Sequence, residues 1–223
     1  MAAARKKVTR QSREVRIKAI LEAAREVFEE RGYDKATVAE IAEKIDVVEG
    51  TVFSYFSSKR TLVLKVMEQF YEQITELIES GIKGVEGTRN RLHYVIWNHL
   101  NIVANNSALC GVILRESRGL DIELAQQVHE LNKRYTHIVV EVIREGIEQG
   151  DIQADTSATL VRNTIFGTIE HYLWDLVGGG VDTDIDAVAA DLTNLVFEGI
   201  SAGTEDVKRE DVSRLIKKLN ELL

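Results

Sequence analysis

Apolar residues recur at helical spacing along almost the whole chain. Runs of positions three, four and seven apart predict amphipathic α-helices rather than strands. The runs are divided at glycines, and the 223 residues include no proline, the usual helix breaker. This pattern predicts an all-α protein without internal repeats. The expected helices cover about 9 or 12–31, 37–45, 49–55, 59–80, 88–105, 109–118, 121–149, 156–177 and 184–202.

The most specific local pattern lies in residues 37–59. Thr37 and Glu40 have the spacing of a capping box, and an apolar helix face follows them. Asp46 falls where the chain has to turn, and aspartate tolerates the left-handed conformation better than most residues other than glycine. A second short segment, 49–55, comes after the turn. Two short helices joined by a tight turn predict a helix-turn-helix, whose second helix can enter a DNA major groove.

The helices on either side of this stretch complete a module. The first helix carries an apolar stripe on which the two short helices can pack, and Gly32 is its expected C-cap. The helix that starts at Lys59 is long enough to link this module mechanically to the rest of the chain. Near the C-terminus, 204–223 has a further apolar stripe and is expected to form a docked amphipathic helix.

The position of the charges favours a nucleic-acid partner although the net charge is -8. Residues 1–60 hold 13 basic and 10 acidic side chains, whereas the rest of the chain holds 15 basic and 26 acidic ones. A basic N-terminal module is thus attached to an acidic body. The alternative is that the most basic part, within 1–18, is only a solvated arm.

The single cysteine indicates a reducing compartment. Cys110 cannot form an internal disulfide, and its apolar neighbours predict a buried thiol rather than a redox sensor. No signal peptide or long uncharged apolar run is visible, so we expect a soluble cytoplasmic protein without membrane contact.

The residues around the helix-turn-helix resemble the TetR family of transcriptional regulators. The resemblance rests on a first helix ending in Phe28 to Gly32-Tyr33, and on the two short motifs after it. These read Thr37-Val38-x-x-Ile41-Ala42 and Gly50-Thr51-Val52-Phe53-x-Tyr55-Phe56-x-x-Lys59-x-x-Leu62. The resemblance implies an N-terminal helix-turn-helix DNA-binding domain, 9–58, and a helical ligand-binding and dimerisation domain, 59–203.

The family resemblance also implies which residues meet DNA. Thr37 and Lys59 would contact phosphates from the starts of two helices, where free N–H groups and the helix dipole favour an anion. The groove-facing positions would lie on or beside the second short helix, where the Thr51 methyl could meet a thymine methyl. The expected DNA-binding set is Thr37, Val48, Glu49, Gly50, Thr51, Phe53, Ser54, Tyr55 and Lys59.

Three positions in or near this set depart from the family pattern. Asp46 replaces the usual turn glycine, and Val48 replaces the usual polar cap of the second short helix. Phe53 stands where the family usually has a tyrosine, so the phosphate contact of that hydroxyl is missing, and Tyr55 could compensate. Glu49 could accept a hydrogen bond from a cytosine amino group or only support the start of the helix.

Family members dimerise through their last two long helices, which here would be 156–177 and 184–202. A pseudo-palindromic operator would then receive one recognition helix from each subunit. Binding of a small molecule in the second domain would favour a state with misplaced recognition helices and so release the DNA.

Two short segments, Gly146 to Ile152 and Ile165 to Glu170, resemble the branch of the family that senses fatty acyl-CoA. Plain helix packing explains the same residues, so the effector is left as a small apolar molecule with acyl-CoA as one option. An acidic body would need basic residues such as Arg115 or Arg118 to hold the phosphates. The expected effector-binding candidates are Met67, Tyr71, Tyr94, Trp97, Asn98, Asn101, Arg115, Tyr135, His171 and Trp174. Of these, the group Trp97, Asn98 and Asn101 is favoured, since pockets combine aromatic walls with polar anchors.

No motif predicts an enzyme. The histidines at 93, 99, 129, 137 and 171 lack the spacing of a zinc site, and no phosphate-binding glycine loop or nucleophile elbow occurs. We therefore expect no catalytic residue, metal or cofactor. Two alternatives stay open. One is a regulator of this fold that responds to a protein partner or to no small molecule, and the other is a helical binding or enzymatic protein that carries a borrowed N-terminal module.

Overall fold

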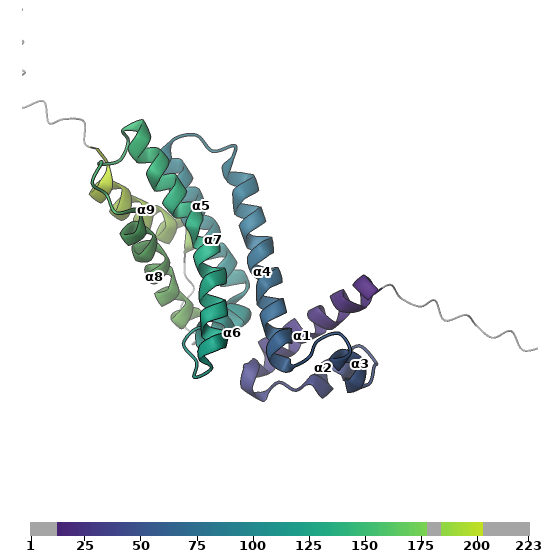
Figure 1. Ribbon diagram of the computed structural model, residues 1–223. Helices are drawn as coiled ribbons and strands as arrows, with labels where there is room; N and C mark the ends of the chain where they lie inside the picture. The colour runs from purple at the N-terminus through teal and green to yellow at the C-terminus, as the bar shows by residue number, and fades with distance from the viewer. Residues whose placement is uncertain (1–12, 178–183, 203–223) are drawn as a thin grey trace, which may run out of the picture. The chain divides into compact units, whose positions relative to one another are not determined.

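The computed structural model describes residues 13–177 and 184–202, and this part of the chain is helical (Figure 1). Within these residues no strand occurs, and the only extended pairing is an isolated antiparallel bridge between Ile152 and Ser201. The predicted all-α fold is therefore confirmed. The helices are α1 (Arg13–Lys35), α2 (Val38–Lys44), α3 (Glu49–Phe53), α4 (Lys59–Ile82), α5 (Thr88–Asn105), α6 (Ser107–Glu116), α7 (Ile122–Gln149), α8 (Ala158–Val177) and α9 (Ile185–Ile200).

The predicted helix boundaries agree with the structure to within a few residues. The helix expected over 88–105 has the same bounds as α5. The second short helix ends two residues earlier than predicted, at Phe53, because the chain turns at Ser54. The predicted C-terminal helix, 204–223, lies outside the described residues, as does the most basic part of the N-terminal arm.

Helix α1 is interrupted at Gly32. This residue has φ of 73° and ψ of 167°, a left-handed conformation that glycine adopts at no steric cost. The prediction that Gly32 ends the first helix is right about the break, although helical backbone resumes after it as far as Lys35. The buried face of α1 comprises Ile20, Leu21, Ala23, Ala24, Val27 and Phe28.

Helices α1, α2 and α3 share one small core, as predicted. Helix α2 packs on α1 and on α3, and α1 also packs on α6. The core is closed by residues that are almost fully buried, among them Ile41 from α2, Val52 from α3 and Phe56 just after it. Short helices of five and seven residues gain their stability from this packing, since alone they would be marginal in water.

The chain divides into two compact units that do not follow its linear order. The first contains the described residues up to Leu77, Val103–Tyr135 and the end of α8 from Leu173. The second contains Ile78–Ile102, Thr136–Tyr172 and the described residues from 184 onward. Four helices, α4, α5, α7 and α8, therefore contribute residues to both units.

Helix α5 is the centre of polar contacts in the second unit. Trp97 donates its indole N–H to Asp186 of α9 at 2.6 Å, and His93 shares a 3.1 Å hydrogen bond with the buried hydroxyl of Thr193. Because that hydroxyl donates to the Ala189 carbonyl at 2.6 Å, His93 Nδ1 must be the donor to it. Successive turns of α5 are thus fastened to α9.

The start of α5 also packs closely on the end of α7. Thr88 donates its hydroxyl to Asp151 at 2.7 Å. A Cβ on Gly146 would come within 2.6 Å of the Thr88 methyl and 2.7 Å of Ile152 Cδ1, so only glycine permits this approach. The bridge of Ile152 with Ser201, next to a 2.9 Å hydrogen bond from the Gln153 N–H to the Ile200 carbonyl, then holds the end of α9 at this place.

The predicted burial of Cys110 is confirmed. Only 8% of the residue is exposed, and burial raises the pKa of its thiol to about 12. At neutral pH the thiol is therefore protonated and a poor nucleophile, because the thiolate is the reactive form. None of the helices in the described part of the chain has the length and apolar character needed to cross a membrane.

His99 should make the protein less stable in mild acid. Its ring packs edge to face on Phe166 with centroids 4.7 Å apart, and burial lowers its pKa to about 3. Below about pH 6.5 the unfolded chain binds a proton at His99 that the native state does not, so stability falls as the pH drops toward 3. The slope has an upper limit of about 1.4 kcal/mol per pH unit. Urea unfolding between pH 6.5 and 4.5 measures it.

We expect the free energy of unfolding of the His99→Leu variant to depend less on pH than that of the unmodified protein. The matched control is His129→Leu, because His129 is exposed and its replacement should leave the slope as in the unmodified protein. A His99→Leu slope equal to that of the unmodified protein would show that His99 does not cause the acid sensitivity.

Candidate DNA-binding surface and effector pocket

The start of α2 is fixed by the predicted capping box. The Thr37 hydroxyl oxygen accepts from the Glu40 N–H at 3.2 Å, while the Glu40 carboxylate accepts from the Thr37 N–H at 2.9 Å. The carboxylate also accepts from the Thr37 hydroxyl at 2.9 Å, and these bonds lower the pKa of Glu40. Thr37 is exposed, yet its hydroxyl is already used as donor and acceptor within the box.

The turn between α2 and α3 takes the conformation expected from the sequence. Asp46 has φ of 53°, the only positive φ of a residue other than glycine in the described chain. Val48 is the N-cap of α3 and supplies no side-chain hydrogen bond. The departure from a polar cap at this position therefore leaves the first N–H groups of α3 without a side-chain acceptor from the cap.

Helix α3 presents an exposed surface of small and apolar groups. Val48 is 74% exposed and Phe53 is 45% exposed, whereas Val52 on the opposite side is buried. At Gly50 an added Cβ would meet no atom within 4 Å, so this part of the surface is open to a close approach. Glu49 and Ser54 are exposed, and Thr51 and Tyr55 are partly exposed.

No lysine or arginine lies between Lys44 and Lys59, so α3 itself carries no cation. Lys44 is paired with Glu26 at 3.0 Å and with Glu30 at 2.9 Å. The exposed face of α3 is consequently suited to contacts with base edges and methyl groups rather than to ion pairing with phosphate.

Lys59, the first residue of α4, faces the end of α1. Its ammonium group donates to the backbone carbonyls of Tyr33 at 2.9 Å, Asp34 at 3.2 Å and Ala36 at 3.2 Å. It also lies 4.6 Å from the centre of the Tyr33 ring. The predicted phosphate contact of Lys59 therefore competes with a set of bonds inside the protein.

The next residue ties the start of α4 to the start of α7. Arg60 forms ion pairs with Asp121 at 3.3 Å and with Glu123 at 3.0 Å. Nearby, Glu116 at the end of α6 is only 8% exposed, and burial followed by the negative charge of Asp34 raises the pKa of its carboxyl group. Charged groups thus link the DNA-binding helices to the junction of α6 and α7 within the first unit.

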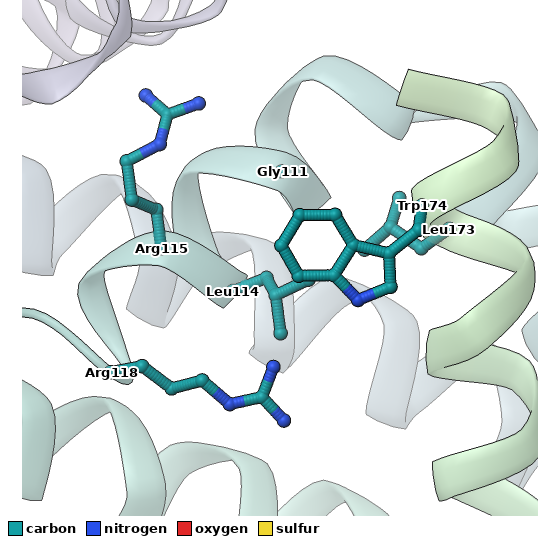
Figure 2. A pocket seen from close by; sticks show the side chains of 6 residues that line it. All are labelled: Gly111, Leu114, Arg115, Arg118, Leu173 and Trp174. Atoms are coloured by element: carbon teal, nitrogen blue, oxygen red, sulfur yellow. The ribbon is translucent and has the colours of Figure 1, made fainter. Parts of the chain in front are cut away.

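A cavity of about 260 Å³ lies between α6 and the end of α8 in the first unit. Figure 2 shows the Trp174 indole over Leu114, with the Arg118 guanidinium directed below the indole. The Arg115 guanidinium points away from the indole in the same view. The cavity is lined by Gly111, Leu114, Arg115, Arg118, Leu173 and Trp174.

The structure brings together two of the predicted effector-binding residues, Arg115 and Trp174. Arg118, which the sequence suggested as a basic residue at the mouth, joins them. Leu114 and Leu173 were not predicted, because in the sequence they are ordinary members of apolar helix faces. They line the cavity because the end of α8 packs near α6, and helical periodicity does not indicate which helices pack together.

The remaining predicted effector-binding residues lie elsewhere. Met67, Tyr71 and Tyr135 are buried in the first unit, where the two tyrosine rings are 5.9 Å apart. Burial raises the pKa of both phenols. These three residues line no described cavity in the part of the chain that the structure covers, so their contact with an effector stays a prediction.

The favoured group on α5 belongs to the second unit. Asn98 and Asn101 each donate a side-chain N–H to the carbonyl four residues earlier, at 2.8 and 2.9 Å, and Trp97 is bonded to α9 as described above. Tyr94 lies against Gly81, where its hydroxyl occupies the place of an absent Cβ. His171 is exposed on α8.

Comparison with known protein families gives two matches that together span most of the chain. Residues 20–66 match the family described as bacterial regulatory proteins, tetR family. Residues 64–199 match the C-terminal region of YsiA-like proteins. The first match contains the helix-turn-helix, and the second runs from within α4 to the last turn of α9.

Two relatives with a described role are regulators. The fatty acid metabolism regulator protein of Bacillus subtilis is 31% identical over 181 residues, which are 81% of this chain and 93% of that protein. The transcriptional repressor KstR2 of Rhodococcus jostii is 22% identical over 192 residues, 82% of this chain and 90% of that repressor.

Solved structures show the same fold. A crystal structure of FadR from Bacillus subtilis in complex with stearoyl-CoA has a TM-score of 0.75 at 31% identity, and the match covers 82% of this chain and 98% of that one. FadR from Bacillus halodurans, a fatty acid degradation regulator, has a TM-score of 0.74 at 26% identity over the same shares of the two chains.

Proposed function

Because this chain belongs to the TetR family of bacterial transcriptional regulators, we propose that it is a homodimeric repressor released from its operator by a fatty acyl-CoA. It is a DNA-binding regulator of the helix-turn-helix type. In the proposal, α3 and the residues beside it read a pseudo-palindromic operator, with one half-site for each subunit.

The chemistry of the cavity between α6 and α8 supports a ligand of mixed character. Leu114, Leu173 and Trp174 give it apolar walls, and the side chains of two arginines complete its lining. Arginine is well suited to phosphate because its planar donors match the oxygen atoms. An acyl-CoA combines an apolar chain with phosphate groups, and the Bacillus subtilis relative was crystallised with stearoyl-CoA.

One observation carries the proposed coupling between effector and DNA. Arg115 lines the cavity, and its Nη1 lies 3.0 Å from where a Cβ of Gly32 would be, so the guanidinium rests against the kink of α1. Gly32 stands five residues before Thr37 and the start of α2. A phosphate group that drew Arg115 toward the cavity would remove it from α1, so effector and operator would favour different positions of one side chain.

The dimer is proposed to form through α8 and α9. One side of each helix contacts α5: α8 through the ring of Phe166, and α9 through the hydroxyl of Thr193. Other residues of the same helices are left exposed, including Leu160 at 65% and Leu195 at 73%. At Gly167 and Gly199 an added Cβ would meet nothing within 4 Å, which allows a partner helix to approach closely. A four-helix interface between two subunits would bury this surface.

Stearoyl-CoA should release the protein from operator DNA. The operator can be selected from random duplex DNA with the purified protein and then used in a gel shift. Saturating stearoyl-CoA is expected to weaken operator binding by about 5–150-fold, the usual range of such coupling. Stearate alone lacks the phosphates, and coenzyme A alone lacks the chain, so each should act more weakly.

Calorimetry with the Arg118→Ala variant tests the site itself. This variant should bind stearoyl-CoA more weakly, because a charge-assisted phosphate contact is lost. The exposed Arg144, on the part of α7 that belongs to the second unit, provides a matched Arg→Ala control that should bind normally. In the gel shift, operator binding that stearoyl-CoA leaves unchanged would reject the proposed effector and leave the DNA-binding role intact.

A further inference from the structure

We infer that Glu49 determines part of the operator sequence: its carboxylate accepts a hydrogen bond from the amino group of a cytosine in the major groove. Each half-site then holds a C·G pair at the position that Glu49 meets. The inference rests on the DNA-binding surface proposed above and names the base chemistry that this surface selects.

The carboxylate of Glu49 is available to a partner outside the protein. Glu49 is the first residue of α3, and its side chain is exposed. Among the described residues it forms neither a hydrogen bond nor an ion pair. The Thr51 N–H, for example, donates to the Val48 carbonyl at 2.8 Å. Glu49 therefore supports the start of its own helix only through the helix dipole, and its oxygen atoms are left to accept from another molecule.

No cation of the described helix-turn-helix is paired with Glu49. Lys44, at the end of α2, is bonded to Glu26 and Glu30 of α1 at 3.0 and 2.9 Å, and α3 itself contains no lysine or arginine. An unpaired carboxylate that approaches DNA is repelled by the phosphates of every sequence. Only a base that offers a donor offsets this repulsion, so an acid here increases selectivity rather than affinity.

The groups beside Glu49 permit a close approach and keep the accepting character of this face. Val48 is apolar and 74% exposed, and an added Cβ at Gly50 would meet no atom within 4 Å. The Ser54 hydroxyl donates to the Thr51 carbonyl at 2.6 Å, so it can only accept from a base. Glu49 and Ser54 thus both offer acceptors to the groove.

The major-groove edges of the bases differ in what they present to a carboxylate, which can only accept. Cytosine presents its N4 amino donor, whereas guanine presents the acceptors N7 and O6, and thymine presents the acceptor O4 beside its methyl group. Adenine has a donor at N6, but the acceptor N7 lies next to it. A carboxylate is therefore repelled by guanine and thymine, partly repelled by adenine and attracted by cytosine.

Selection of bound duplexes from random DNA tests the inference with the unmodified protein and the Glu49→Gln variant. A glutamine amide can accept from adenine N6 and donate to adenine N7 at the same time. We therefore expect the preferred pair at one position of each half-site to change from C·G to A·T, while the other positions keep their preference. Identical selected sequences for the two proteins would overturn the inference.

Titration with operator duplexes measures the size of the effect. Replacing the C·G pair in one half-site should weaken binding of the unmodified protein by about 5–100-fold, the usual range for one base contact. Glu49→Ala should bind the original and the altered duplex equally, because its methyl group does not distinguish them. If Glu49 only supported the helix, Glu49→Ala would lose the same factor of affinity for every duplex and keep the discrimination, and this result would overturn the inference.

Glu43→Gln is the matched control, since it removes the same charge from an exposed glutamate of α2. It should select the same operator as the unmodified protein, and a change from C·G to A·T in this variant would also count against the role of Glu49. If the unmodified protein selected no sequence at all, the proposed DNA-binding surface would be rejected together with the inference. A selected operator that the substitutions of Glu49 leave unchanged would reject the inference alone.

Discussion

Replacing Leu195 with arginine should dissociate the protein into monomers and lower its operator affinity by about a hundredfold or more. Leu195 lies on α9 with 73% of its surface exposed in the single chain. In the proposed dimer it would be buried between helices of the two subunits. Two arginines there would carry unpaired charges into an apolar interface, which is strongly unfavourable.

The loss of affinity follows from the loss of bivalency. A dimer that has placed one recognition helix holds the second near its half-site at an effective concentration in the millimolar range. A monomer lacks this advantage and must bind each half-site separately. The effect on DNA binding should therefore be large although Leu195 is not part of the DNA-binding surface.

Light scattering coupled to size-exclusion chromatography measures the mass, and a titration with operator DNA measures the affinity. The matched control is Leu77→Arg, which adds the same charge at another leucine that is 55% exposed. Leu77→Arg should stay dimeric and bind normally. A Leu195→Arg protein that remains dimeric and binds the operator fully would place the interface elsewhere.

The second large effect is expected at Arg115. In the Arg115→Ala variant, a saturating concentration of stearoyl-CoA should no longer weaken operator binding, so the coupling falls to about onefold from the 5–150-fold range usual for such systems. The reason is that the alanine side chain can contact neither the effector nor the kink at Gly32. An effector bound in the cavity would then stabilise the DNA-binding state and the released state equally, so it could not shift the equilibrium between them.

Arg118→Ala is the informative comparison, since Arg118 lines the same cavity but points toward Trp174 (Figure 2). That variant should need more stearoyl-CoA and yet show full release at saturation. Measuring operator affinity at several effector concentrations separates the two behaviours. Full release of Arg115→Ala at saturation would mean that the coupling runs through other contacts, for example those of Arg60.

The DNA-binding helices could be predicted in detail because their pattern is local. The box of Thr37 and Glu40, the turn at Asp46 and the uncapped start at Val48 each depend on residues within a few positions of one another. Local spacing determines such features, so the sequence is enough to predict them.

Lys59 shows where local reasoning stops. The family resemblance implies that it contacts a phosphate, and in the structure its ammonium group donates to carbonyls of residues 23 to 26 positions earlier in the chain. The direction of a long, flexible side chain is decided by such distant partners. A sequence pattern indicates that a cation is present and does not indicate which way it points.

The lining of the proposed effector cavity could be predicted only in part for the same reason. Trp174 and Arg115 were selected by their chemistry, which an acyl-CoA would require. Trp97, Asn98 and Asn101 met the same criteria, but their polar atoms are bonded to Asp186 or to their own helix. Amide side chains on a helix often return to the backbone, and only the three-dimensional arrangement reveals this.

The exposed apolar surface of α3 has a consequence for heat. Val48 and Phe53 stand free of the protein core, and a recognition helix that enters the major groove would remove them from water. Removal of apolar surface from water lowers the heat capacity on binding. The enthalpy of operator binding should thus become steadily more favourable on warming, while its entropy becomes less favourable. The cell's temperature would therefore change the balance between the enthalpic and entropic contributions to the binding free energy.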